Sequence, residues 1–325
     1  MLRHKWSEGY SQSHHARGLA VSKSHRRRRR NVEEVELASL FRRFEHEYGD
    51  AYVRLAADLR AHYPEITRRG RRTGRALHNI CFFAWCSCRD ADRKLIPTLF
   101  RAAVLLSAQD DYYDNAHIPA AQKESFCLAT NRALRTNSFS RHFERSRQLR
   151  DLTSLWSNVA GTIPRRASQV RSYWIETACQ LNDAMAAENR ARRRATITYE
   201  EYMRTAIHSI GMVFIWATYL AHAHVRLTTL REMAPVLLQG ASIVRLSNDM
   251  ASYRQRRNKE NALTLVGGRS PEARILRLVL QESRAFRQSV EALDVGPHVR
   301  GVLLHSIDFL REFYQRFDFD RAPAW

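Results

Sequence analysis

The chain has 325 residues, of which 44% are hydrophobic, and it contains only 12 glycines and 8 prolines. This composition supports a sizeable core with few turns and predicts a mostly helical globular protein. No stretch reaches the roughly 18 uninterrupted apolar residues of a membrane span, and no hydrophobic signal core lies near the start. These features exclude a membrane-embedded or secreted chain, so we expect a cytoplasmic protein.

The net charge of +20 is unevenly distributed, with an excess at the start of the chain. Residues 1–30 contain nine lysines and arginines against one acid, Glu8, and so carry +8 of that charge. We expect residues 1–31 to form a disordered basic leader, because they repel one another and are poor in apolar side chains. The leader could tether the protein to nucleic acid or to an anionic membrane, or serve as an organelle transit peptide. We favour a solvated tail or an over-extended reading frame.

Helical periodicity dominates the rest of the chain. Residues 32–63 place apolar side chains at intervals of three and four, with charges between them. Further helices are expected at 75–88, 93–115, 118–136, 142–160, 165–192, 198–225, 227–257, 271–293 and 296–316. The alternating pattern of strands is almost absent. We therefore predict one all-α domain over residues 32–325, a helical bundle around a central cavity.

Three carboxylates follow an apolar helix in the stretch QDDYYDN, residues 109–115. A helix turns by about 100° per residue, so Asp110 and Asp114 share one face and Asp111 lies beside Asp114. Such like charges repel one another unless a cation binds them, and carboxylate oxygens suit Mg²⁺. An acidic, solvated helix end is the alternative, but the apolar helix that precedes the motif favours a metal site.

A second set of oxygen ligands lies in NDMASYRQR, residues 248–256. Asn248 and Ser252 are four residues apart and share a helix face. Ordinary helix polarity would explain these two residues if they stood alone. Together with the aspartates, they could face a common cavity in which several Mg²⁺ ions hold a diphosphate.

The two motifs resemble those of class I terpene synthases, and the sequences around SIG and ENALTL resemble bacterial diterpene synthases of this family. DDYYD is similar to the aspartate-rich motif of this family, and NDMASYRQR is similar to its second motif, whose usual pattern is (N/D)DxxSxxxE. The resemblance implies the α-helical terpenoid synthase fold, with a central apolar active-site cavity where three Mg²⁺ ions bind a prenyl diphosphate. Departure of the diphosphate would then leave an allylic carbocation that cyclises.

The resemblance also implies the metal ligands. Asp110 is the expected main Mg²⁺ ligand of the first motif, assisted by Asp111 or Asp114. Asn248 and Ser252 match the first two ligands of the second motif.

The sequence departs from the family at the third ligand of the second motif. Arg256 stands where the family usually has glutamate, and an arginine cannot ligate Mg²⁺. Water, Asp249 or Glu260 could complete that ion, although Glu260 lies about 12 Å beyond Ser252 on a straight helix. Arg256 could instead donate to the diphosphate.

Basic and tyrosine side chains are expected to hold the diphosphate. Arg204 resembles the family's upstream diphosphate-sensing arginine. Gly211, in the sequence SIG, resembles a glycine that breaks a helix and opens backbone carbonyls to the pocket. Near the end of the chain, Arg311 and Tyr314 resemble the arginine and tyrosine that cap the diphosphate.

Aromatic faces can stabilise a carbocation, each by roughly 0.5 to 2 kcal/mol. Individually, such residues more often pack the core. The candidates for the wall of the pocket are Phe82, Phe83, Trp85, Tyr112, Tyr113, Phe214, Trp216 and Tyr219.

The resemblance therefore implies a class I cyclase that converts C20 geranylgeranyl diphosphate to a diterpene. A labdane-type bicyclic diphosphate or a C15 substrate is the alternative, and the chain has no DxDD motif for protonation-initiated cyclisation. A prenyl chain-elongating synthase would carry a second aspartate-rich motif where this chain has NDMAS. A basic nucleic-acid-binding protein would explain the charge but not DDYYD, so no nucleic-acid partner is expected. The oligomeric state stays open, although relatives often form homodimers.

Overall fold

The computed structural model describes residues 38–68, 73–139, 146–165, 168–191, 197–223, 225–254, 261–267 and 270–316. The contacts divide the chain into two compact units, residues 1–49 with Trp325 and residues 50–324. In the first unit, the described residues 38–49 are helical. The predicted basic leader, residues 1–31, lies outside the described residues.

The second unit is built from helices, and its described residues include no strand. It begins with helical residues 50–62. The helices that follow are α2 (Pro64–Arg68), α3 (Thr73–Ser87), α4 (Ile96–Asp114), α5 (Ala120–Thr136), α6 (Arg147–Thr162), α7 (Ser168–Ala191), α8 (Tyr199–Ser209), α9 (Met212–His222), α10 (Leu227–Arg254), α11 (Ala262–Val266), α12 (Pro271–Ala292) and α13 (Pro297–Arg316). The predicted all-α class is confirmed.

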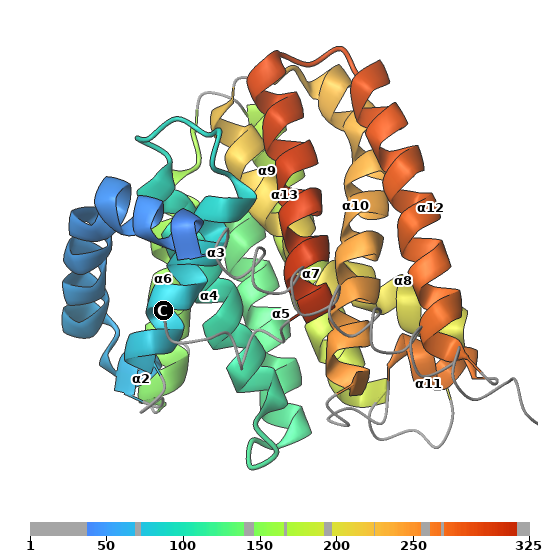
Figure 1. Ribbon diagram of the computed structural model, residues 1–325. Coiled ribbons are helices and arrows are strands. Elements are labelled where there is room, and N and C mark those ends of the chain that lie inside the picture. The colour runs from blue at the N-terminus through green and yellow to red at the C-terminus, as the bar shows by residue number, and fades with distance from the viewer. Residues whose placement is uncertain are drawn as a thin grey trace, which may run out of the picture. The chain divides into compact units, whose positions relative to one another are not determined.

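Packing within this unit centres on helices α10, α7 and α4. Helices α10, α12 and α13 lie side by side, and α13 also contacts α3 (Figure 1). Helix α7 packs against α5, α8 and α9, while α4 packs against α3, α6 and α9. None of the described helices combines the length and the apolar character that crossing a bilayer requires.

A break separates α8 from α9 and reaches the centre of the unit. Thr198 and Glu201 form a capping box that starts α8, and the helix ends at Ser209. Gly211 follows in the left-handed region, with φ +75°, where only glycine is unstrained. A Cβ at this position would lie 2.4 Å from the methyl carbons of Leu106 in α4. The predicted break at Gly211 is confirmed, and it lies against α4 one turn before Asp110.

Candidate active site

The aspartate-rich stretch forms the last turn of α4. Tyr112 and Tyr113 are buried, whereas Asp110, Asp111 and Asp114 are exposed. At about 100° per residue, Asp110 and Asp114 are about 40° apart around the helix, but Asp110 and Asp111 are about 100° apart. Two of the three aspartates therefore share one flank of α4.

Asp111 points elsewhere. It lines a small pocket with Ile66 of α2 and Ile80 of α3. Among the residues that the structure describes, no three acidic, histidine or cysteine side chains lie close enough to hold one metal ion. The three aspartates stay predicted Mg²⁺ ligands, with Asp111 about 100° around the helix from Asp110.

The end of α4 is fixed by two side chains from other helices. The ammonium of Lys123, a buried residue of α5, donates to the carbonyl oxygen of Tyr113 at 2.5 Å. The amide of Asn189 in α7 donates to the same oxygen at 2.9 Å. The Tyr113 ring packs at 6.4 Å from that of Phe126 in α5. Both donors satisfy a carbonyl that the helix end would otherwise leave open.

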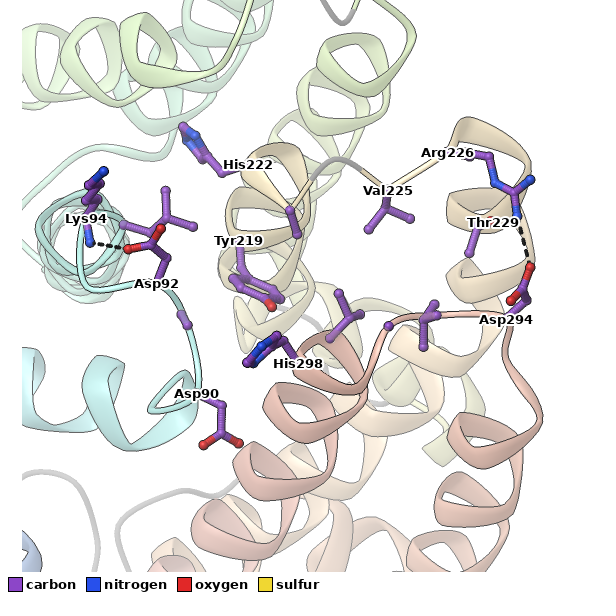
Figure 2. Close-up of a pocket in the computed structure, with 16 residues that line it drawn as sticks. Asp90, Asp92, Lys94, Tyr219, His222, Val225, Arg226, Thr229, Asp294 and His298 are labelled. Carbon is purple, nitrogen blue, oxygen red and sulfur yellow. Dashed lines mark hydrogen bonds and ion pairs between the residues drawn. The ribbon is translucent and has the colours of Figure 1, made fainter.

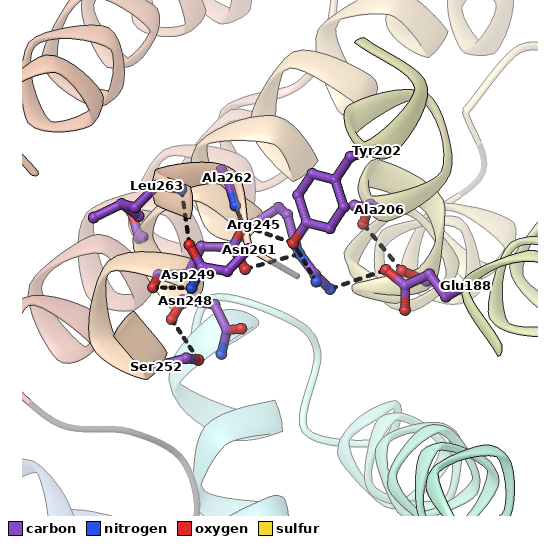
Figure 3. Close-up of polar contacts among 12 residues, drawn as sticks. Glu188, Tyr202, Ala206, Arg245, Asn248, Asp249, Ser252, Asn261, Ala262 and Leu263 are labelled. Carbon is purple, nitrogen blue, oxygen red and sulfur yellow. Dashed lines mark hydrogen bonds and ion pairs between the residues drawn. The ribbon is translucent and has the colours of Figure 1, made fainter. Parts of the chain in front are cut away.

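The second set of oxygen ligands lies near the end of α10. Asn248 is half-buried, and the buried Ser252 donates its hydroxyl to the Asn248 carbonyl at 3.0 Å (Figure 3). Asp249 is oriented by other contacts, because its carboxylate accepts the Tyr202 hydroxyl at 2.6 Å and the Ala262 amide at 3.0 Å. Asp249, a predicted alternative ligand, thus anchors the start of α11 to α10.

A buried ion cluster lies one turn before Asn248. The guanidinium of Arg245 lies 3.1 Å from Asp249 and 3.4 Å from Glu188 of α7, and donates to the Tyr202 hydroxyl (Figure 3). Burial alone would lower the pKa of Arg245, but Asp249, Tyr202 and Glu188 outweigh it and hold that pKa well above its ordinary value. Arg245 therefore stays charged beside the second motif.

Sequence analysis did not identify Arg245. Its only signal was a charged residue within the apolar stretch of α10, three positions before Asn248. Its partners lie far away in sequence, so the spacing of the motif could not indicate them.

Helix α7 connects the two motifs. Glu188 pairs with Arg245, beside the second motif, and its neighbour Asn189 donates to Tyr113, within the first. The two oxygen sets, although on different helices, are thus both tied to one turn of α7.

The predicted diphosphate ligands lie in two places. Arg204 is exposed on α8. In α13, Arg311 is a quarter exposed and lies 3.8 Å from Asp308, while Tyr314 is buried edge-to-face with Phe313. Arg256 and Glu260 lie outside the described residues.

Part of the predicted aromatic wall forms one cluster between α3 and α13. The Phe83 ring lies edge-on to that of Phe313, with 4.2 Å between the centroids, and 5.5 Å from that of Phe309. Phe82 lies 6.2 Å from Phe309 and also 6.2 Å from Trp85. The two α13 phenylalanines were not among the predicted residues, although they recur four positions apart.

The α9 candidates pack elsewhere. The Phe214 ring lies 5.4 Å from that of Trp156 and 5.7 Å from that of Trp174. Trp216 donates its indole N–H to Ser306 in α13 at 3.1 Å. The predicted aromatic residues thus belong to separate clusters.

Comparison with known families decides the identity of the chain. The family described as terpene synthase family 2, C-terminal metal binding, matches residues 101–266, just over half of the chain and the part that holds both motifs. The chain belongs to this terpene synthase family. No curated protein matches it by sequence.

Solved structures with the same fold are terpene synthases. Isoprene synthase from grey poplar leaves, in complex with three Mg²⁺ ions and dimethylallyl-S-thiolodiphosphate, is 14% identical with a TM-score of 0.64, covering 85% of this chain and 54% of its own. Abietadiene synthase from Abies grandis is 13% identical with a TM-score of 0.64, over 84% and 38% of the two chains. Aristolochene synthase from Penicillium roqueforti is 11% identical with a TM-score of 0.55, over 81% and 95%. The chain therefore spans about half the length of isoprene synthase and shares the fold of all three.

A pocket of about 940 Å³ lies at the end of α4 opposite the aspartate-rich turn (Figure 2). It is lined by Leu95 at the start of α4, by Tyr219 at the end of α9, and by His298 at the start of α13. Leu95 and Asp110 are 15 residues apart, about 22 Å along α4 at 1.5 Å per residue. The pocket therefore lies away from the aspartate-rich turn, and Tyr219 stays a predicted wall residue.

Proposed function

We propose that this terpene synthase is a Mg²⁺-dependent class I cyclase that ionises a prenyl diphosphate, C20 geranylgeranyl diphosphate in preference to shorter chains. The observation that carries the proposal is the shared anchoring of two oxygen sets. Asp110 and Asp114 end α4, Asn248 and Ser252 lie near the end of α10, and α7 residues 188–189 hold both.

The donor set fits Mg²⁺. Magnesium takes one or two carboxylates, keeps several waters and shares substrate phosphates, so it does not need a cage of three aspartates. Asp110, Asp114, Asn248 and Ser252 all supply oxygen ligands to this cation. Three ions, the number bound in the poplar isoprene synthase, are proposed here as well. Bound Mg²⁺ would neutralise the charge that develops on the departing diphosphate.

The other predicted ligands act on the diphosphate in this proposal. Arg204, Arg256 and Arg311 supply guanidinium donors, and Tyr314 supplies a hydroxyl, so that the leaving group is held after its bond to carbon breaks.

The apolar part of the substrate needs a dry wall. The buried rings of Phe83 and Phe313 and the half-buried ring of Phe309 present both faces and edges between α3 and α13. Such a wall excludes water from a carbocation, and each ring face stabilises it by roughly 0.5 to 2 kcal/mol.

The proposal is tested by incubating purified protein with Mg²⁺ and, separately, C10, C15, C20 and C25 prenyl diphosphates. Mass spectrometry of the organic extract is expected to show a cyclic product from the C20 substrate. A product from the C15 or a labdane diphosphate would retain the cyclase and change its substrate, whereas longer linear diphosphates would indicate chain elongation. No turnover, with salt-dependent DNA binding that survives deletion of residues 1–30, would refute it in favour of nucleic-acid binding.

Asp110→Asn tests the metal motif directly. The amide keeps the size of the side chain but loses the charge that holds Mg²⁺, so turnover should fall by about a hundredfold or more while the melting temperature is retained. Asp294→Asn is the matched control, because this carboxylate is 87% exposed and lies in the pocket at the other end of the domain. Full turnover in Asp110→Asn would contradict the assignment.

The cytoplasmic location and the homodimer remain predictions from the sequence.

A further inference from the structure

A chain of hydrogen bonds runs directly behind the aspartate-rich turn, from buried side chains to the exposed carboxylate of Asp183. The indole N–H of Trp156 donates to Gln109 Oε1 at 2.7 Å, and Gln109 Nε2 donates to Asn182 Oδ1 at 2.6 Å. Asn182 Nδ2 then donates to Asn131 Oδ1 at 2.9 Å, and Asn131 Nδ2 donates to Asp183 Oδ1 at 2.8 Å. We refer to these five residues as the amide relay, which joins α4, α5, α6 and α7.

The direction of the amide relay is determined at both ends. An indole N–H can only donate and a carboxylate can only accept, so each of the three amides between them has a single compatible orientation. Burial raises the pKa of Cys127 to about 12, so its neutral thiol also donates to Asp183, at 3.4 Å. Gln109, Asn182 and Asn131 are buried, yet both ends of each amide are satisfied.

Filling a core with such a network costs more free energy than filling it with apolar side chains. Each buried amide loses its hydrogen bonds to water, and only complete hydrogen bonding within the protein offsets that loss. An apolar side chain has no such requirement. What the amide relay adds over leucine is orientation, because hydrogen bonds fix direction and apolar contacts do not.

The orientation that the relay fixes is the rotation of α4. With Gln109 taken as the buried reference, Leu106 lies about 60° around the helix, Asp110 about 100° and Asp114 about 140° in the same sense. Leu106 contacts the break between α8 and α9. Holding Gln109 therefore turns Asp110 and Asp114 toward the side of α4 on which that break lies.

We propose that Gln109 is a positioning residue for the metal motif: through the amide relay, it sets the rotation at which α4 presents Asp110 and Asp114 to Mg²⁺ and diphosphate. This role rests on the proposed function. Residues that orient metal ligands from behind typically change metal affinity or activity by about 10 to 100-fold when they are replaced.

Gln109→Leu is the test. The variant keeps the volume of the side chain but leaves the Trp156 N–H and the Asn182 carbonyl unpaired. Thr218→Val is the matched control, because it leaves the indole N–H of Trp174 unpaired in the same core, on α9. Two readouts are compared. The first is the rise in melting temperature caused by Mg²⁺ with inorganic diphosphate. The second is the Mg²⁺ concentration that gives half-maximal turnover, measured below the melting temperature of both variants.

The expected result is a half-saturating Mg²⁺ concentration raised about tenfold or more in Gln109→Leu, with a smaller Mg²⁺-dependent rise in melting temperature. Thr218→Val should lose stability while both Mg²⁺ readouts stay as in the wild type. Equal Mg²⁺ dependence in the two variants would overturn the positioning role and leave Gln109 as a core residue only.

Trp156→Phe decides the matter if Gln109→Leu does not fold. Phenylalanine keeps an aromatic ring at this position but has no N–H to donate to Gln109 Oε1, while the bond from Gln109 to Asn182 is retained. The half-saturating Mg²⁺ concentration of this variant should be higher than that of the wild type, and an unchanged value would overturn the role. A wild type that neither responds to Mg²⁺ with diphosphate nor turns over any substrate would overturn the proposed function itself, whereas an active wild type whose relay variants show normal Mg²⁺ dependence would overturn the positioning role alone.

Discussion

Replacing Gly211 by alanine should destabilise the protein through two additive effects. The left-handed backbone at φ +75° costs a non-glycine residue about 1 to 2 kcal/mol. The new Cβ would lie 2.4 Å from two methyl carbons of Leu106, and relieving such an overlap typically costs about 1 to 3 kcal/mol. The lower entropy of the unfolded alanine chain returns about 0.4 to 1 kcal/mol, so we expect a net loss of about 1 to 4.5 kcal/mol.

Equilibrium unfolding in urea measures this loss, with linear extrapolation to water. Gly161→Ala is the matched control, because Gly161 lies within α6 and a Cβ there would meet nothing within 4 Å. Alanine in that helical position should stabilise by about 0.5 to 1 kcal/mol, the opposite sign.

The double variant Gly211→Ala with Leu106→Ala separates the two effects. Removing the Leu106 methyls abolishes the overlap but not the backbone strain, so on that background Gly211→Ala should cost only about 0 to 1.5 kcal/mol, which is the strain less the entropy term. A Gly211→Ala variant as stable as the wild type would refute the reasoning. An equal loss in both backgrounds would show that Leu106 does not resist the new side chain.

Two further predictions concern buried ionisable groups. Arg245→Met should lower the free energy of unfolding, measured in urea, by about 3 to 5 kcal/mol, because it leaves the largely buried Asp249 and Glu188 without their cation. Arg226→Met, from an exposed ion pair, should change it by less than about 1 kcal/mol. Equal losses in the two variants would contradict the assigned cluster. Burial lowers the pKa of His208 from its ordinary value of about 6.5. The unfolded state then binds the proton more readily, so the free energy of unfolding should fall as the pH drops below about 6.5. In unfolding measurements from about pH 8 to 5, His208→Gln should show a smaller fall than the wild type. Identical pH profiles would contradict this role of His208.

Periodicity was sufficient to predict the long helices. The apolar spacing of residues 93–115 and 227–257 anticipated α4 and α10, because one buried face over many turns gives a strong signal. The break at Gly211 was also predictable, since glycine tolerates a backbone that other residues avoid. The five-residue helices α2 and α11 were not predicted, because a single turn has no period to detect.

The site was less predictable than the fold. That Asp110 and Asp114 share a flank follows from helix geometry alone, whereas their orientation depends on partners far along the chain. Gln109 bonds to a residue 73 positions away, and Arg245 to one in another helix. An apolar pattern shows which face of a helix is buried, but it does not show which polar side chains meet across that face. The aspartate motif was therefore found, while the residues that orient it were not.

These long-range contacts converge on α7, which gives the candidate active site a common frame. Asn182 holds Gln109 beside the first motif, and Glu188 holds Arg245 beside the second. Asn182 and Glu188 lie six positions apart on one uninterrupted helix. At 1.5 Å per residue, this separation is about 9 Å, and it is set by regular helical hydrogen bonds. Because α4 and α10 are each fixed to α7, the distance between the two oxygen sets depends on one rigid element. A substitution on α7 should then disturb both motifs together, whereas a substitution on α4 or α10 should disturb one.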